Sequence, residues 1–524
     1  MLPPGVPAPK RPQMDREPKL PPREVIASVS GRVLDPGSSF VIEGVSARPT
    51  AYVGNRLTIS KSTDVDARYE LIHGVARTLG WTAVLEDEDP KTVGLKFGLR
   101  RVTLAIDAGS VAVLAPDAWT LLQQLRLRHK DWAELEGIGL DHVVAGAPWD
   151  SSHPWDSSHP WDSSHPWDSS HPSNAPGWPV SNYGIPGQGG RQPVAYVGPR
   201  PHRRPEEQIA GRRPVVAILD TGCGEHDWLA PPVVTRGLKL DGFDIGYDIA
   251  ATSPEEFPDQ TGALDGMIDP LSGHGTFIAG LVHQGCPDAD ILSWRVVPSA
   301  GPIVESDWVT ALAQIAELAR RFRAGEEGGH AIDVLSLSMG YYHETPQDLL
   351  FDPTLFAILD DLAGNGTVVV CSAGNDATSR PCFPAAFAPW ADGNNVVTSP
   401  PGHLPIVSVG ALNPNHVTDA LFSNAGYWVR SHAVGGGVVS TVPAFQGGLL
   451  PVARTVAFGR VRDNIDPDDY RGGFGVWSGT SFAAPLKAGQ IARHLLKDMA
   501  SGDSIADAVA RGWKAVEALT EIKQ

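Results

Sequence analysis

Three glycine-containing segments carry side chains suited to proton transfer and nucleophilic attack. Asp220 follows an apolar, strand-like run and precedes a turn (ILDTG), a position from which a carboxylate can orient a catalytic base. His274 stands between two glycines (GHGT), which let the backbone bend and keep the imidazole accessible. Ser481 (GTSFAAP) is expected at the N-terminus of a long helix, where free N–H groups and the helix dipole favour developing negative charge. Each residue alone is more often a structural turn or helix-cap residue than a catalytic one, so the evidence lies in their combination.

Two further segments accompany these motifs, each at the end of an apolar run. Residues 370–375 have the sequence VCSAGN, and residues 336–340 have the sequence SLSMG. Along the chain the five segments follow one another as those around Asp220, His274, residues 336–340, residues 370–375 and Ser481. With the segments in this order, the chain resembles the subtilisin-like serine peptidases, the subtilase or S8 family, over about residues 211–498. The five segments together are far more specific than any one of them.

The resemblance implies a serine endopeptidase that hydrolyses peptide bonds through an acyl-enzyme. Ser481 is then the nucleophile, His274 the general base and Asp220 the carboxylate that orients the base. The side-chain amide of Asn375 and the backbone N–H of Ser481 are expected to bind the oxyanion. The residues expected to contact an extended peptide substrate are Ser336, Leu337, Ser338, Met339, Gly340, Ala373 and Gly374.

The same resemblance implies chemistry that requires no cofactor and no metal. Members of the family often bind structural calcium, but the sequence contains no Asp, Asn or Glu cluster that assigns the ligands. Lys487 departs from the family pattern close to the nucleophile, and its charged end is expected to reach solvent. The Gly-rich segment at about 432–474 is interpreted either as a lid or as a surface excursion.

Strand-like runs and helical segments alternate from about residue 211 onward. This alternation, with strands apolar on both faces, indicates an α/β domain with a parallel sheet and helices on both sides. Active sites of such sheets lie at the carboxyl ends of the strands. A helix with Val309 and Leu312 on its apolar face is expected to be capped by Ser306 or Asp307. The other expected elements are strands at 215–219, 291–297, 334–337, 368–371 and 406–409, and a helix over roughly 353–363.

The chain of 524 residues is too long for one ordinary domain. Composition divides it into a Pro-rich disordered tail (1–22), a small α/β or α+β domain (23–145), a Pro/Gly-rich linker (146–210), the subtilisin-like catalytic domain (211–500) and a helical tail (501–524). The small domain is expected to contain a helix with Tyr69, Ile72 and Val75 on one face, and a second helix capped by Asp117. Its expected strands are 82–86, 95–106 and 111–114.

A hexapeptide, PWDSSH, occurs four times in tandem between residues 148 and 171. A period of six matches neither a helix nor a strand, and Pro in every copy favours extended structure. We interpret the run as repeat expansion in a flexible tether, with a binding role as the alternative. The residues that would serve such a role are His153, His159, His165 and His171, and Trp149, Trp155, Trp161 and Trp167.

Composition excludes several classes of function. A formal net charge of -18 argues against nucleic acid as a partner, because phosphate binding relies on clustered Lys and Arg. No run of about 18 apolar residues predicts a membrane span, and no secretory signal is recognised at the start, so a cytoplasmic location is expected. The four cysteines are interpreted as free thiols, with one or two disulfides as the alternative.

Three functional interpretations remain. In the first, an active endopeptidase cuts extended protein or peptide segments, and the domain at 23–145 serves recognition or control. In the second, that domain is an inhibitory propeptide, removed by a cut within residues 173–210. In the third, the chain is a catalytically silent scaffold that retains the fold. The presence of Asp220, His274, Asn375 and Ser481 together disfavours the third. The first is preferred to the second, because the domain at 23–145 is larger than the short propeptides usual in the family that the chain resembles and no secretory signal is recognised.

Overall fold

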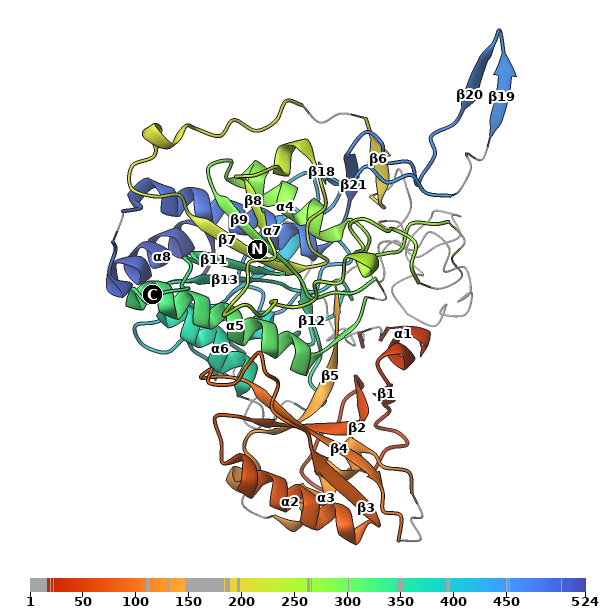
Figure 1. Ribbon diagram of the computed structural model, residues 1–524, viewed down its shortest axis with the longest axis vertical. Helices are drawn as coiled ribbons and strands as arrows, with labels where there is room; N and C mark the ends of the chain where they lie inside the picture. Colours follow the sequence, from red (N-terminus) through yellow and green to blue (C-terminus); the bar gives the residue numbers. More distant parts are fainter. Residues whose placement is uncertain are drawn as a thin grey trace, which may run out of the picture.

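The computed structural model shows two folded parts, an N-terminal module (residues 23–146) and a C-terminal domain (residues 211–524), which lie against each other (Figure 1). The repeats at 148–171 and the expected strand at 111–114, except for Leu114, lie outside the described residues. The structure describes residues 17–18, 20–21, 23–109, 114–129, 132–146, 183, 189–195, 198–261, 264, 266–299, 301–345, 353–392, 396–448, 451, 453–500 and 502–524.

A seven-stranded sheet, in which every pairing is parallel, forms the centre of the C-terminal domain. Its spatial order is β17 (His432–Val434), β16 (Val407–Leu412), β13 (Val368–Ser372), β11 (Val334–Leu337), β7 (Val215–Asp220), β9 (Asp290–Arg295) and β8 (Val234–Arg236). The expected parallel sheet is thus confirmed. The two strands that sequence patterns missed, β8 and β17, are short edge strands that carry little apolar periodicity.

Helices cover both faces of this sheet, as expected from strands that are apolar on both sides. Along β7, Ala217 packs in the core under α5 (Glu305–Ala324) and α6 (Thr354–Gly364). The next residue, Ile218, packs in a second core with α4 (His274–Gly285), α7 (Thr480–Leu495) and α8 (Ile505–Leu519). Because successive strand residues point to opposite faces, one apolar strand supplies both cores.

The N-terminal module is an antiparallel sheet covered by two helices, which confirms the α+β expectation. The helices are α2 (Val65–Thr78) and α3 (Ala118–Arg128), and Asp117 caps α3 as predicted, accepting from Thr120 N at 2.9 Å. The strands are β1 (Gly31–Leu34), β2 (Thr50–Ser60), β3 (Trp81–Leu85), β4 (Leu99–Ile106) and β5 (Ile138–Gly146). A short helix, α1 (Arg23–Ser28), precedes them.

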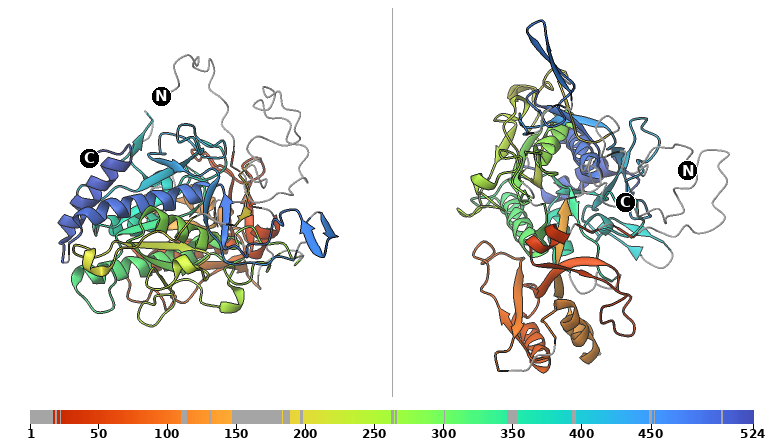
Figure 2. Two further views of the ribbon diagram at one scale, coloured as in Figure 1. Left: turned by 90° about the horizontal axis from the view of Figure 1, so that it is seen from above. Right: turned by 90° about the vertical axis from the view of Figure 1, so that its right-hand side faces the viewer.

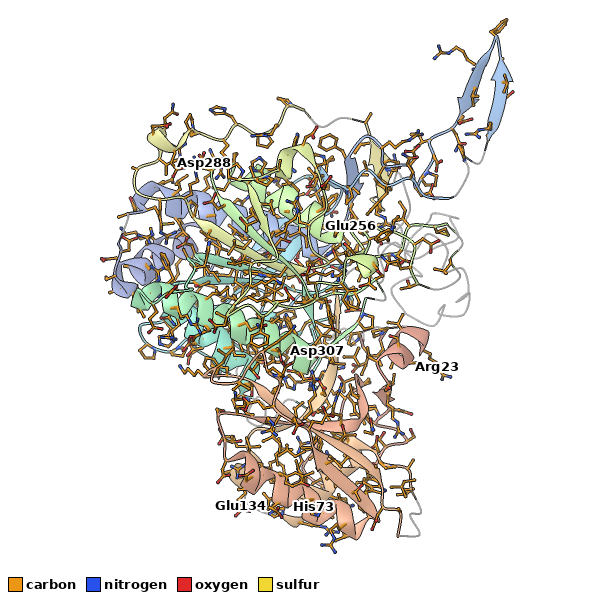
Figure 3. All side chains as sticks on the ribbon, in the orientation of Figure 1. Arg23, His73, Glu134, Glu256, Asp288 and Asp307 are labelled. Atoms are coloured by element: carbon orange, nitrogen blue, oxygen red, sulfur yellow. The ribbon has the colours of Figure 1, made fainter. Side chains whose placement is uncertain are left out.

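Strand β5 connects the module to the C-terminal domain. Figure 1 shows it extending out of the module, and its last residues pair antiparallel with two short strands of the other domain. These strands are β10 (Ile303–Val304) and β12 (Met339–Gly340). Side chains reinforce the contact: Arg101 pairs with Asp307, labelled in Figure 3, and Lys96 pairs with Asp361 at 2.5 Å.

The module also caps a helix of the C-terminal domain. Helix α5 begins after Val304, whose side chain has no hydrogen-bonding group, so the prediction of a cap by Ser306 or Asp307 is wrong. Asp141 of β5 takes that role, because its carboxylate accepts from Ser306 N at 2.9 Å and from Ser306 Oγ at 2.8 Å. A cap from another part of the chain leaves no local sequence signal.

Several described residues before 211 pack on the C-terminal domain. Strand β6 (Gln192–Val194) pairs with β21 (Phe474–Trp477), and Arg204 pairs with Asp288 at 2.8 Å. The described residues between 189 and 210 are therefore attached to the domain, whereas the linker prediction for 147–182, 184–188 and 196–197 falls on residues outside the described ones.

The segment at 432–474 forms strands and an extended hairpin. Strand β18 (Val438–Thr441) pairs with β21, and the hairpin of β19 (Arg454–Ala457) and β20 (Arg460–Asp463) projects from the body in both views of Figure 2.

A further two-stranded pair is formed by β14 (Trp390–Ala391) and β15 (Val396–Val397). Among the residues that the structure describes, no helix has the length and apolar character needed to cross a membrane.

Candidate active site

The structure brings the three motif residues together from the ends of three elements. Asp220 is the last residue of β7, His274 the first residue of α4, and Ser481 the second residue of α7. All three are buried, with exposed fractions of 2 %, 1 % and 0 % respectively. The parallel sheet places a strand end and two helix starts at one edge, as the sequence pattern predicted.

Asp220 and His274 form a tight hydrogen-bonded pair. His274 Nδ1 donates to Asp220 Oδ1 at 2.7 Å, and the backbone N–H of Thr221 donates to the same oxygen at 2.8 Å. A neutral imidazole that donates through Nδ1 carries its lone pair on Nε2. Among the described residues, His274 Nε2 has no hydrogen-bond partner, so that lone pair is available for a proton.

Ser481 is hydrogen-bonded to the neighbouring strand segment. Its Oγ donates to the carbonyl of Ser338 at 3.3 Å, and Ser338 Oγ donates back to the carbonyl of Ser481 at 3.0 Å. The rings of Trp477 and Phe482 lie 5.6 and 5.2 Å from the His274 ring, centroid to centroid. These aromatic side chains enclose the imidazole in an apolar environment, which strengthens its hydrogen bond to Asp220.

Asn375 lies at the same helix start. Its Oδ1 accepts from the backbone N–H and the hydroxyl of Thr480, both at 2.8 Å. This contact turns Nδ2 toward Gly479, where an added Cβ would lie 3.4 Å away. Gly374 has φ +101°, and a Cβ there would lie 2.4 Å from the Asn424 amide, so this turn requires glycine.

Some of the remaining residues expected to bind substrate lie inside the parallel sheet, and others pair with the N-terminal module. Ser336 and Leu337 belong to β11 and pair with β7 and β13 inside the sheet. Met339 and Gly340 form β12, which pairs with Gly146 and Ala145 of the module rather than with a separate peptide. Ala373 is buried and donates its N–H to the carbonyl of Val409 at 3.0 Å, inside the sheet.

Comparison with known proteins agrees with this geometry. The model of the subtilase family, Peptidase S8, matches residues 211–508. The chain belongs to the subtilase family.

Solved subtilases were compared with the whole chain. A cold adapted subtilisin-like serine proteinase is 18 % identical over 58 % of this chain and 82 % of its own, with a TM-score of 0.35. Fervidolysin from Fervidobacterium pennivorans, a keratinolytic enzyme related to subtilisin, is 17 % identical over 88 % of this chain and 56 % of its own, with a TM-score of 0.41. The chain thus spans just over half the length of fervidolysin. No curated protein matches the chain.

A buried carboxylate that sequence analysis missed, Glu255, lies next to the segments that carry Asp220 and His274. It accepts from the hydroxyls of Thr221 and Thr276 and from the N–H of Gly275, the last at 3.1 Å. Burial raises the pKa of Glu255 to about 7. Glu255 therefore binds the residues that follow Asp220 and His274 along the chain. It lies in a loop, where no motif or periodicity marks it.

Lys487 of the subtilase is not extended into solvent, contrary to expectation. Its side chain is buried, and Nζ donates to the carbonyl of Leu519 at 2.8 Å, at the end of α8. Burial lowers the pKa of this lysine. Lys487 therefore fastens the C-terminal helix to α7.

None of the four cysteines, all of which the structure describes, forms a disulfide. Three are buried, and Cys223 is partly exposed. Burial raises the pKa of Cys223 to about 12 and that of Cys286 to about 11, so both remain neutral thiols.

Proposed function

We propose that this subtilase is a serine endopeptidase that uses Ser481, His274 and Asp220. The observation that carries the proposal is the 2.7 Å hydrogen bond from His274 Nδ1 to Asp220, which leaves Nε2 able to accept a proton beside the helix start that bears Ser481. A charge-assisted hydrogen bond of this length fixes the ring orientation and the tautomer that a general base needs.

The reaction then follows from the geometry. Ser481 Oγ leaves the carbonyl of Ser338, transfers its proton to His274 Nε2 and attacks the scissile carbonyl carbon. His274 returns the proton to the amine that departs, and Asp220 stabilises the charged imidazole in between. Water then attacks the acyl-enzyme, with His274 acting again as the base. The Ser481 side chain must rotate from the carbonyl of Ser338 toward His274 Nε2. Such a rotation is compatible with catalysis, because catalytic hydrogen bonds often form only once substrate is bound.

Asn375 and the N-terminus of α7 are suited to bind the oxyanion. Thr480 holds the Asn375 Oδ1, which directs the Nδ2 donor to the side of Gly479. Donors fixed in this way stabilise charge in the transition state without reorganising. No cofactor takes part in these steps.

The proposal extends to the N-terminal module, which acts as an inhibitor. Strand β5 pairs with β12 in the way an extended peptide adds to a strand edge, and Gly146 stands opposite Met339. Met339 follows Ser338, the residue that accepts the hydrogen bond of Ser481. The module thus blocks the nucleophile, which supports the inhibitory interpretation over recognition alone. A self-processing cut is then expected beyond Gly146.

The substrates proposed are extended or unfolded protein segments, because a strand-like backbone is what pairs with β10 and β12. A cytoplasmic location is also part of the proposal. Four unpaired cysteines suit a reducing compartment.

A fluorophosphonate probe, which labels only an activated serine, tests the proposal. We expect a mass increase of one probe per chain on a peptide containing Ser481 in the wild-type chain, and none in Ser481→Ala. Labelling should be slow while the module is attached, and faster after trace protease has cut between residues 147 and 182. A chain that is never labelled, even after that cut, would support the catalytically silent scaffold instead.

A further inference from the structure

A second group of ionisable side chains is buried where the module meets the subtilase domain, apart from the triad. His142 lies on β5 of the module, Glu305 is the first residue of α5, and His343 and Glu344 follow β12. Their exposed fractions are 1 %, 1 %, 6 % and 1 % respectively. Burial of four ionisable residues in one interface is costly unless their charges are balanced.

The donor atoms of this group converge. His142 Nδ1 lies 2.6 Å from Glu305 Oε2, and His142 Nε2 lies 2.7 Å from Glu344 Oε2. His343 Nδ1 lies 4.0 Å from the same Glu344 oxygen and, among the residues the structure describes, has no hydrogen-bond partner. One donor atom each from His142, His343 and Glu344 thus lie within 4.8 Å of one another.

The chemistry of these donors is that of a transition-metal site. Two imidazoles and one carboxylate form a ligand set that zinc uses. A metal-binding histidine usually donates its other ring N–H to a carboxylate, which fixes the tautomer, and Glu305 occupies that position beside His142 Nδ1. The buried Nδ1 of His343 has no hydrogen-bond partner among the described residues, and a bound cation would satisfy it.

We propose that His142, His343 and Glu344 bind one divalent transition-metal ion, with zinc as the preferred ion, between the module and the subtilase domain. Zinc bonds of about 2.0–2.2 Å require neighbouring donor atoms about 3.3 Å apart, so the side chains adjust by about 1 Å. A fourth tetrahedral position remains for water.

The surrounding charges suit a dication. Glu305 and Glu344 place two carboxylates against the ring of His142, at 2.6 and 2.7 Å from its two nitrogens. Arg380 donates to the carbonyl of His343 at 2.6 Å and pairs with Glu17 at 3.1 Å. Its charge is thus directed at these groups.

The site draws its ligands from both parts of the chain. His142 belongs to the inhibiting strand, whereas His343 and Glu344 belong to the subtilase domain, so only the docked state offers all three. A ligand that binds one state stabilises that state, so the ion would hold the module in place. This consequence rests on the proposed inhibitory function; the site itself does not.

The test uses the full chain with Ser481→Ala, which prevents self-digestion. The four repeat histidines, His153, His159, His165 and His171, are replaced by Gln, so that the repeats contribute no imidazole ligand. Because the site is buried, metal is supplied during expression and bound zinc is measured after gel filtration, with cobalt(II) as the spectroscopic probe. We expect one zinc per chain and the visible absorption of tetrahedral cobalt.

Three variants in this background locate the ion. His142→Gln and His343→Gln should each weaken binding by at least about 100-fold, and Glu305→Gln by about 10- to 100-fold, because it removes an outer carboxylate. His283→Gln is the matched control: His283 is also buried, lies on α4 and is outside the cluster, so zinc binding should be unchanged. Circular dichroism shows whether each variant is folded.

Two results would overturn the site: less than 0.1 zinc per folded chain, or one zinc that persists in both His142→Gln and His343→Gln. The coupling to inhibition is measured separately, in the wild-type chain, as the lag before casein cleavage. A chelator present during expression should shorten this lag several-fold. If zinc-loaded and zinc-free wild type show the same lag, the coupling to inhibition is refuted but the metal site is not. The zinc stoichiometry is measured without peptidase activity, so it stands even if the chain cuts nothing.

Discussion

At the scale of single residues, the hydroxyl of Ser481 donates to the carbonyl of Ser338. His274 Nε2 has no hydrogen-bond partner among the described residues. In the proposed inhibited state, β5 pairs with the strand segment next to the one that Ser481 contacts. Asp220 already fixes the ring of His274. Under that proposal, release of β5 is the step that permits chemistry.

Replacing Asn375 by Leu tests the oxyanion donor. The substitution keeps the volume but removes the amide, so the transition state loses a hydrogen bond that the ground state hardly uses. We expect kcat on a peptide substrate to fall about 100- to 1000-fold with KM little changed, the magnitude known for the equivalent amide of subtilisin. A loss confined to KM would show that Asn375 binds substrate instead.

Glu255 gives the stability of the chain a pH dependence. Its pKa rises from 4.5 to about 7 on folding, because the carboxyl group is buried. Between those values the unfolded chain ionises while the folded chain keeps the proton, so the free energy of unfolding falls as pH rises, by about 3 kcal/mol in all.

Glu255→Gln should remove this slope. We expect urea unfolding of Ser481→Ala between pH 4.5 and 7.5 to show the decline, and Ser481→Ala with Glu255→Gln to show a flatter curve. Equal slopes in the two chains would mean that Glu255 is ionised in the folded state.

At the scale of elements, α5 depends on the module for its cap. Asp141→Ala removes the acceptor of Ser306 and also leaves the partly buried Arg56 without its ion pair, at 2.7 Å in the structure. The free energy of unfolding should fall by at least about 1 kcal/mol. The lag before casein cleavage should shorten as well, because the lost contact crosses the interface between module and domain.

Ser504→Ala is the control for that experiment. Ser504 caps α8 in a capping box within the C-terminal domain, so its loss should also cost about 1 kcal/mol. The lag should then stay unchanged. If both variants shorten the lag equally, general destabilisation rather than the cap of Asp141 is responsible.

Sequence patterns located the elements whose signals are local. Strands such as β11 and β13 are apolar on both faces, and Asp117 precedes an apolar helical run, so their positions were predictable. Strand β5 was missed because Asp141 and His142 interrupt its apolar pattern. These two polar residues are buried by partners from the other domain, and pairing over so long a sequence separation leaves no local pattern.

The same distinction applies to the site. The triad lies in short motifs next to strand ends and helix starts, which sequence alone can reveal. Glu255 and the cluster around His142 are assembled from a loop, a strand and a helix start, and only the folded chain brings their atoms within hydrogen-bond distance.

At the scale of the whole molecule, the N-terminal module and the subtilase domain meet along strand β5. The strand pairs of β5, the cap from Asp141 and the ion pairs of Arg101 and Lys96 all lie on this contact. No single contact is strong at the exposed positions, but together they hold the strand opposite Met339. If the module inhibits as proposed, activation requires a cut in the connection to the module, followed by its departure.

Mass-spectrometric mapping of every cut, in wild type and Ser481→Ala incubated alone and with casein, tests the central claim most directly. The account predicts that wild type cuts its own chain beyond Gly146 and then cuts casein, whereas Ser481→Ala cuts neither. The claim would be contradicted if Ser481→Ala cut casein as wild type does. It would be contradicted equally if wild type, freed of its module, left casein intact.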